Sequence, residues 1–461
     1  MSRGNNRNKI CQSIWFQAEL YLQSPLILGN GEDETTDYDL LRDLEGNHFI
    51  PGSSLAGVMR SAVTESEGLL QVQLDRIFGD SKDGSRQSVI TVYDSCLIQE
   101  KEYNCVIRDG IEVHGLTKTA KNKSKYNFEV LESGACFQFR IEFLLREATR
   151  ELPVLQFISN LLRCAEEGDL RIGAKTNRGY GKIGFRNCRM KNLILKDAAD
   201  MRAYIHFNWD ETADKEINQL PMPTYHSQYT ILSVPLKVES ALLIRNYALN
   251  NLDVDCEQLT EHKKEDFLGD LEEYGRAVIP GTSWNGLIRH IADRILENTE
   301  WISRQEAQKM LRSLFGAEKD SEEKSASRII FEESVDERQQ SNANFKNVTR
   351  IKIDRFTQGV LKTALFSERV AVGGQYTLNA RIYKAKDYEI GLILLAMEEI
   401  LNGMEAIGGA TSVGRGTFLK NGSICLNGET LPDKQKAAYW EALTEKLKGR
   451  DFHEISIGGD R

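Results

Sequence analysis

The chain has 461 residues, 41% hydrophobic and 28% charged, which is enough apolar content to bury the cores of two to four domains. No apolar run reaches the roughly 18 to 20 residues that span a bilayer, and the N-terminus lacks a signal peptide's apolar segment, so we expect a cytoplasmic protein with no membrane partner. The net charge of −9 argues mildly against a nucleic-acid partner, although phosphate-binding surfaces are local and the total charge does not exclude one.

The cysteines and histidines form no metal-binding motif. The eight cysteines are scattered without a C-x-x-C pair, and no two of the seven histidines stand four residues apart. We therefore expect reduced core cysteines, and no zinc site.

The same series of elements occurs twice along the chain. An alternating strand leads to an Ile-Pro-Gly turn, an amphipathic helix, a Phe-Gly pair and a strand with an acidic end. A basic stretch, a second alternating strand, a helix and a glycine-rich loop follow. FIPGSSLAGVMRSAV at 49–63 matches VIPGTSWNGLIRHIA at 278–292, and RIGAKTNRGYGKI at 171–183 corresponds to IGGATSVGRGTF at 407–418. This repetition indicates a duplication.

Each half predicts an α+β domain in which helices cover one face of a sheet. The split β-α-β-β-α-β pattern, ferredoxin-like or RRM-like, fits this order best. We expect a first domain at 1–224 and a second at 225–461, with the boundary near Pro221 and Pro223. The tail after Phe418 predicts an amphipathic helix, and packing onto the second domain is favoured over a partner surface.

The Ile-Pro-Gly turns carry the first binding hypothesis. Proline and glycine set a tight turn, and the following hydroxyl pair stands where helix N-caps are preferred. Such a helix start would present backbone N–H groups to an anion. A capped structural helix with an exposed arginine is the alternative, but the matching arginine in both copies favours anion binding. The residues concerned are Ser53, Ser54, Arg60, Thr282, Ser283 and Arg289.

Two further basic stretches support a phosphate-rich ligand. The first glycine-rich loop contains Arg171, Lys175, Arg178 and Lys182 and no acidic residue. Glycines allow close approach to a phosphate chain, and cations attract it. The stretches at 116–129 and 348–366 are basic as well. A solvated loop is the simpler interpretation, but the second one interleaves Phe356 among its cations, which suits contact with bases and phosphates.

The ordered set of motifs resembles the RAMP superfamily. It is similar in particular to the crRNA-binding backbone subunits of type III CRISPR effector complexes (the Csm and Cmr kinds), and the tandem arrangement resembles type III-D fusions. The resemblance covers about 15–418 and implies two RAMP domains with β-hairpin thumbs inserted at about 105–130 and 340–366. The implied partners are a guide crRNA, a target RNA, other RAMP-type subunits and a large polymerase-like subunit. The implied RNA-binding residues are Ser53, Ser54, Arg60, Lys118, Lys121, Lys175, Arg178, Thr282, Ser283, Arg289, Lys352, Arg355, Phe356 and Arg415.

The resemblance also implies an endoribonuclease that cleaves target RNA within the complex. The family's RNA-cleaving aspartate lies six residues before the Asp of a v-x-[RK]-D run, between the first strand and the Ile-Pro-Gly turn. Here the run ends at Asp43, so the position is Asp37, which is also the candidate ligand of a divalent metal ion, Mg or Mn. The other candidate carboxylates are Asp33 and Asp39 in the first copy, and Asp253 and Asp255 in the second, with Asp270 as a further alternative.

Two other functions remain open from the sequence. The second copy lacks the v-x-[RK]-D run, and Gln358 replaces a usual glycine, so a non-catalytic scaffold for guide and target RNA is the nearest alternative. A guide-processing endoribonuclease would need a histidine acid or base. His114 and His290 are its candidates, and neither lies in a glycine-rich loop.

Overall fold

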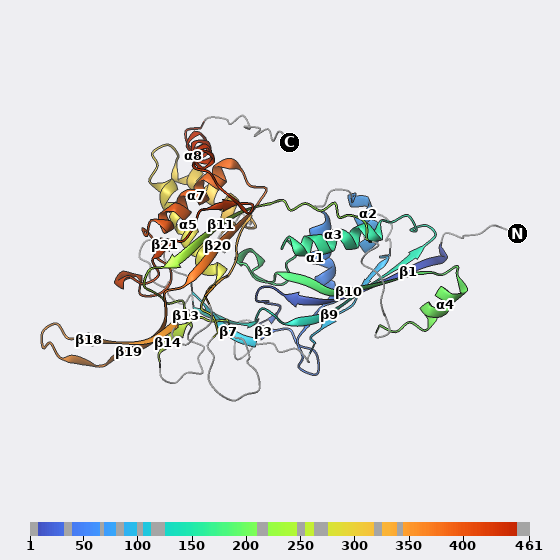
Figure 1. Ribbon diagram of the computed structural model, residues 1–461, viewed down its shortest axis with the longest axis horizontal. Coiled ribbons are helices and arrows are strands. Elements are labelled where there is room, and N and C mark those ends of the chain that lie inside the picture. The colour runs from blue at the N-terminus through green and yellow to red at the C-terminus, as the bar shows by residue number, and fades with distance from the viewer. Residues whose placement is uncertain are drawn as a thin grey trace. The chain divides into compact units, whose positions relative to one another are not determined.

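The computed structural model describes residues 8–31, 39–64, 69–79, 87–98, 105–111, 125–209, 220–246, 254–261, 275–317, 325–338 and 344–449. The chain forms two compact units, coloured by residue number in Figure 1. The first comprises Met1–Ile107, Asn127–Thr176 and Tyr180–Ser227. The second comprises Arg108–Tyr126, Asn177–Gly179 and Gln228–Arg461. No helix in the described ranges is both long and apolar enough to cross a membrane.

The first half of the sequence forms ten strands and four helices within the described residues. The strands are β1 (Ile10–Leu22), β2 (Gly29–Gly31), β3 (Asp39–Leu40), β4 (Phe49–Ile50), β5 (Ile90–Val92), β6 (Ser95–Cys96), β7 (Cys105–Gly110), β8 (Tyr126–Leu131), β9 (Cys136–Arg146) and β10 (Ile183–Ile194). The helices are α1 (Gly52–Thr64), α2 (Gln71–Phe78), α3 (Val154–Glu166) and α4 (Ala198–Ile205).

The main sheet of the first unit has the order β10-β1-β9-β5, with antiparallel pairing throughout. Alternation along β1 sends Phe16 and Leu20 to one face, where they join Met59 of α1 and Phe157 of α3 in the core. Helices α1, α2 and α3 lie along this face in Figure 1. Trp15 points to the opposite face and stacks on Phe207, which follows α4.

The segment that leaves the first unit remains attached to α3. The Asn160 side chain donates to Thr224 Oγ1 at 3.1 Å, and Ser159 Oγ donates to the carbonyl of Pro221 at 2.7 Å. Tyr225 is buried in the first core, and its hydroxyl donates to Asp169 at 2.6 Å. These contacts hold the segment up to Tyr225 on the first unit, whose last stretch of chain ends at Ser227.

The second half forms thirteen strands and four helices within the described residues. The strands are β11 (Tyr229–Val238), β12 (Ala241–Leu242), β13 (Arg245–Asn246), β14 (Cys256–Gln258), β15 (Val278–Ile279), β16 (Ile329–Phe331), β17 (Ser334–Val335), β18 (Phe345–Ile353), β19 (Val360–Val372), β20 (Gln375–Tyr383), β21 (Phe418–Lys420), β22 (Cys425–Leu426) and β23 (Glu429–Thr430). The helices are α5 (Gly281–Glu297), α6 (Arg304–Phe315), α7 (Asp387–Leu401) and α8 (Asp433–Leu447).

The main sheet of the second unit repeats the arrangement of the first. Its order is β16-β20-β11-β22-β23, and β21 also pairs with β11. The strand after the Ile-Pro-Gly helix thus lies at one edge, next to the second long strand and then the first, as β5, β9 and β1 do in the first unit. Trp284 of α5, Leu236 of β11 and Ile393 of α7 share one buried core. The structure therefore has the mixed α+β character that the sequence predicts.

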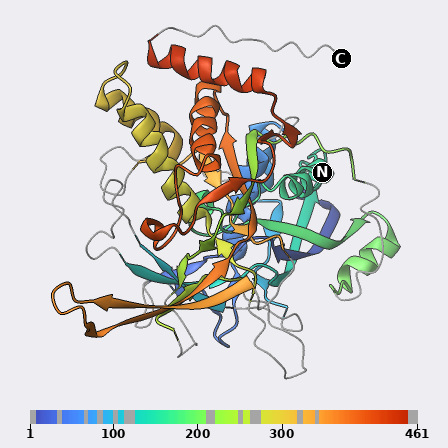
Figure 2. The ribbon, with the colours of Figure 1, turned by 60° about the vertical axis from the view of Figure 1, so that its left-hand side comes forward.

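Two further elements of the second unit matter for the site. Strands β18 and β19 pair antiparallel and form what we call the thumb hairpin, which extends away from the helices of its unit in Figures 1 and 2. At its base, β19 also pairs with β12 and β14.

The C-terminal helix α8 packs on α7 and buries Tyr439, Leu443 and Leu447 in the second core. This packing confirms the favoured interpretation of the tail.

Candidate nucleic-acid interface

The two glycine-rich loops have the same backbone geometry. In the first, the N–H of Ala174 donates to the carbonyl of Ile27 at 2.7 Å, and in the second the N–H of Gly409 donates to Leu243 at the same distance. The preceding glycines, at 173 and 408, have φ of 87° and 89°, and a Cβ there would stand 2.2 Å and 2.5 Å from those same carbonyl oxygens. The glycines thus allow each loop to pack on its own chain.

The cations of the first loop are held in different ways. Lys175 has φ of 55°, and its ammonium lies 3.6 Å from the centre of the Phe128 ring. Arg178 belongs to the short segment grouped with the second unit, where Arg289 also lies. Burial, and then the charge of Arg289, lowers the pKa of Arg178 to about 10, so the Arg178 guanidinium remains charged at neutral pH. Two predicted RNA-binding arginines therefore stand near each other.

The Ile-Pro-Gly corners differ from the expectation of open backbone amides. The N–H of Gly52 donates to the carboxylate of Asp94 at 2.7 Å, so this amide of α1 already has an anionic partner. In the second copy Pro280 and Gly281 are buried. Pro280 is the N-cap of α5, which puts Thr282 inside the first helical turn and not at the cap. The Gly52 amide is therefore already bonded within the protein, and the second corner is buried at Pro280 and Gly281.

The hydroxyl and arginine side chains near these corners have mixed environments. Ser53 is exposed, and Ser54, Thr282, Ser283 and Arg289 are half-buried. Arg60 of α1 forms an ion pair with Asp75 of α2, with 2.7 Å between Nη2 and Oδ1. That pair links α1 to α2.

The thumb hairpin of the second unit presents cations and apolar side chains together. Lys352 and Arg355 are exposed, and Phe356 at the tip is 94% exposed. Asp354 accepts hydrogen bonds from the N–H groups of Phe356 and Thr357, at 3.0 and 2.7 Å, and so fixes the turn. These bonds, above all that from Thr357, lower the pKa of Asp354.

The corresponding thumb of the first copy is described only at its base. Strands β7 and β8 pair there. Lys118 and Lys121, and also His114, lie outside the described residues.

Arg415 of the second glycine-rich loop is mostly buried, and it pairs with a carboxylate. Its Nη1 lies 2.6 Å from Oε2 of Glu368, a fully buried residue on β19. Arg350 of β18 and Arg245 of β13 also approach Glu368, at 2.5 and 3.6 Å. Sequence reasoning did not select Arg245 or Arg350. Arg245 is a single arginine at the end of an alternating stretch and belongs to no motif that would have marked it. Arg350, by contrast, lies within the basic stretch at 348–366.

The acidic loop of the first unit is described only at its ends. Gly31 of β2 and Asp39 of β3 are register partners, and the candidates Asp33 and Asp37 lie outside the described residues. Asp39 is half-buried. The N–H of the next residue, Leu40, donates to Glu129 at 3.0 Å.

Glu129 has further partners that tie it to the protein. Arg42 pairs with it at 2.5 Å, and the Cys105 thiol donates to it at 3.1 Å. Burial alone would raise the pKa of Glu129, but these bonds, with that from Leu40, lower it below its usual value. Glu129 is therefore a carboxylate whose oxygens are already bonded to Leu40, Arg42 and Cys105.

Of the candidate aspartates in the second unit, only Asp255 lies within the described residues. Asp253 and Asp270 lie outside the described residues. Asp255 is exposed, and its backbone N–H donates to the Ser367 carbonyl at 2.9 Å while its carboxylate accepts from the Ser367 N–H at 2.7 Å. This two-point attachment joins Asp255 to the thumb strand β19.

Metal-ligating side chains do not cluster in the described part of the chain. No group of three His, Cys, Asp or Glu side chains there could hold an ion. Carboxylate oxygens are the donors that Mg and Mn prefer, and Asp39 is a suitable donor at the acidic loop. A complete site would need ligands beyond the described residues.

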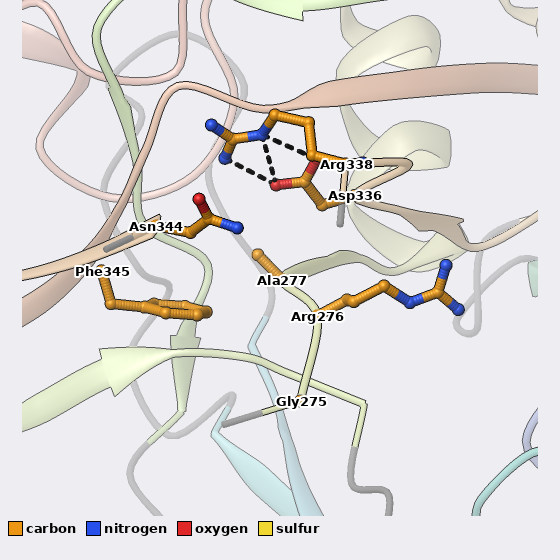
Figure 3. A pocket seen from close by; sticks show the side chains of 7 residues that line it. All are labelled: Gly275, Arg276, Ala277, Asp336, Arg338, Asn344 and Phe345. Carbon is orange, nitrogen blue, oxygen red and sulfur yellow. Dashed lines mark hydrogen bonds and ion pairs between the residues drawn. The ribbon is translucent and has the colours of Figure 1, made fainter. Parts of the chain in front are cut away.

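A small pocket near the start of β18 is lined by both polar and apolar side chains (Figure 3). Arg338 lies across it and is held by Asp336 at 2.7 Å, whereas the Arg276 guanidinium points away and pairs with Glu261 at 2.5 Å. Its two arginines are therefore matched by carboxylates. The lining residues are Gly275, Arg276, Ala277, Asp336, Arg338, Asn344 and Phe345.

Comparison with known proteins places these elements in a family. A model described as the RAMP superfamily matches residues 19–184 and 235–419, well over half of the chain. The chain belongs to the RAMP superfamily. Its two RAMP segments confirm the predicted duplication, and each contains one Ile-Pro-Gly helix and one glycine-rich loop.

One curated relative of this RAMP protein is named CRISPR system Cms endoribonuclease Csm3, from Methanocaldococcus jannaschii. It is 28% identical over 176 residues, which make up 34% of this chain and 69% of the relative. The similarity is distant and concerns about a third of the chain.

Proposed function

We propose that this protein is a backbone subunit of a type III CRISPR ribonucleoprotein in the cytoplasm, binding the spacer part of a guide RNA along two RAMP domains, 1–224 and 225–461. The mixed α+β fold supports this assignment, because in both main sheets the strand after the Ile-Pro-Gly helix lies at one edge, followed by the second long strand and then the first, an order that suits a split β-α-β-β-α-β unit. The distant similarity to Csm3 supports the choice of partners. Those partners are crRNA, target RNA, further RAMP-type subunits and a large polymerase-like subunit.

The thumb hairpin is the observation that carries the proposal. A two-stranded ribbon gains little from exposing Phe356, Ile353 and Val360, which are 94%, 58% and 60% exposed. Bases stack on exposed rings regardless of sequence, and Lys352 and Arg355 beside them attract phosphates. The hairpin is therefore suited to a guide–target duplex that the protein recognises by shape, with sequence left to base pairing.

We further propose that the first unit cleaves target RNA at the acidic loop. A nucleotide displaced from the duplex can align its 2′-oxygen with the adjacent phosphorus. The new O2′–P bond then replaces the bond to the 5′-oxygen, leaving a 2′,3′-cyclic phosphate and a 5′-hydroxyl. Asp37 would accept the 2′-hydroxyl proton while solvent supplies one to the leaving oxygen. An Mg or Mn ion held by Asp37 with Asp39 would supply electrostatic stabilisation of the developing charge.

A non-catalytic scaffold is the second candidate for the second unit. Asp255 is committed to Ser367 at both its amide and its carboxylate, which favours a role in holding the thumb. A guide-processing endoribonuclease has less support, because His290 lies half-buried two turns into α5 and not in a glycine-rich loop.

The test uses the assembled complex, purified with its RNA. Co-isolation of a discrete guide RNA supports the backbone assignment, and its absence refutes it. Asp37→Ala should abolish the cuts made opposite the first unit and leave guide binding intact. Glu45→Ala is the matched control, because Glu45 is an exposed carboxylate on the turn after β3. Unchanged cuts in Asp37→Ala would remove the catalytic assignment and favour Asp39 or Asp33.

A further inference from the structure

Glu368 is an unusual residue at the base of the thumb hairpin. It lies on β19, opposite Val348 of β18 and beside Cys256 of β14, and its side chain is fully buried. A buried glutamate is rare unless it is paired, because desolvating a carboxylate costs several kcal/mol or more. Three guanidinium groups meet this requirement.

The three arginines come from separate parts of the second unit. Arg415 belongs to the glycine-rich loop, Arg350 to the thumb hairpin and Arg245 to β13. One carboxylate with three guanidinium groups leaves a net charge of +2 at this point. The Arg415 side chain is only 10% exposed, whereas those of Arg245 and Arg350 are 36% and 39% exposed.

The exposed pair has spare hydrogen-bonding capacity. A guanidinium carries five N–H donors, and the Glu368 contacts of Arg245 and Arg350 each involve one Nη atom. Arg350 Nε is buried and has no acceptor among the described residues, so the donors open to a ligand are on the exposed part of the guanidinium. Arg245 also lies against the second loop, since a Cβ on Gly409 would stand 2.9 Å from its Nε. Both side chains are thus held in place and partly open to solvent.

We propose that Glu368 is a positioning residue that holds Arg245 and Arg350 as a two-arginine phosphate site where the thumb hairpin meets the glycine-rich loop. The ligand is a phosphodiester of the bound RNA strand, so the inference rests on the proposed function. Planar guanidinium groups suit phosphate oxygens, and a fixed pair loses little side-chain entropy on binding. Arg415 is the structural member that joins the loop to Glu368 and does not contact the RNA.

The direction in which Glu368→Gln changes RNA affinity distinguishes a positioning role from a simple effect of net charge. Glu368→Gln keeps the shape and removes a negative charge. If only net charge mattered, RNA affinity would rise. If Glu368 positions the arginines, they repel one another and separate, so affinity falls, by about tenfold for one good charged contact. Glu368→Asp retains the charge and should recover part of the loss.

The experiment measures binding of a polyuridine oligonucleotide to the full chain over a range of salt. Arg245→Gln and Arg350→Gln should each reduce the slope of log affinity against log salt by about 0.7, the value for one phosphate contact on a single strand. Arg304→Gln is the control, because Arg304 is an exposed arginine paired with Asp293 on neighbouring helices. In the Glu368→Gln background, Arg350→Gln should have little further effect.

The outcomes distinguish this inference from the proposed function. A wild-type chain that does not bind RNA would refute the proposed function. Wild-type binding with unchanged affinity and slope in both arginine variants would refute only the two-arginine site, and tighter binding by Glu368→Gln would refute the positioning role. If Glu368→Gln does not fold, the arginine variants, whose side chains are partly exposed, still decide the matter.

Discussion

Phe356→Ala separates the binding role of the thumb hairpin from its stability. The ring is 94% exposed, so only about 6% of the roughly 200 Å² of a phenylalanine side chain is covered. At about 25 cal/mol per Å², that is about 0.3 kcal/mol of burial, which shifts the unfolding temperature by about 1 °C or less. Stacking of one base on an aromatic ring contributes about 1–3 kcal/mol, so RNA affinity should fall about 5- to 150-fold.

The assay pairs RNA titration with thermal unfolding of the same samples. Met222→Ala is the control, because Met222 is also a large apolar residue, 85% exposed, and its described hydrogen bond is made by its carbonyl. It should alter neither measurement. Full RNA affinity in Phe356→Ala would refute the stacking role, and a large fall in unfolding temperature would show that the ring is buried in solution.

Three further predictions concern stability and need no RNA. Asp94→Ala removes the carboxylate bonded to Gly52 N–H, and should lower the stability of the first unit by about 1 kcal/mol, or about 2–4 °C in a thermal scan. Gln358→Gly should stabilise the thumb by about 0.5–1 kcal/mol and slow its amide exchange, because φ of 53° costs an L-residue about 1–2 kcal/mol and glycine's extra chain entropy offsets only part of this. Burial lowers the pKa of His48, so the unfolded state binds its proton first. Stability should therefore fall as pH drops below about 6.5, and the fall should be shallower in His48→Gln.

The sequence predicted the repeated elements because their signals are local. Alternation along Tyr229–Val238, the turn at Pro280 and the glycines at 408 and 416 each constrain only a few neighbouring residues. Counting such signals in order recovered two mixed α+β copies and the helix-to-strand sequence within each, whereas the hairpin at about 340–366 was implied by the resemblance to the RAMP superfamily.

The candidate site was less predictable because its key pairs are distant in sequence. Asp94 is 42 residues from Gly52, and Arg415 is 47 from Glu368. No sequence periodicity links such residues. The sequence therefore could not show whether the arginine of a basic loop is available to a ligand or paired with a carboxylate of the protein itself. A lone Arg245 after a strand gave no signal either, since its position depends on the return of β19 beside β13 and β14.

The matched backbone geometry of the two glycine-rich loops has an evolutionary consequence. Because the left-handed glycines at 173 and 408 prevent a collision with the preceding strand's carbonyls, selection for folding alone will conserve them. A copy that has lost its ligand would keep the motif and change only its neighbouring charges. Among proteins descended from this duplication, the glycines should therefore indicate common origin, whereas the arginines around them should indicate whether a copy still binds its ligand.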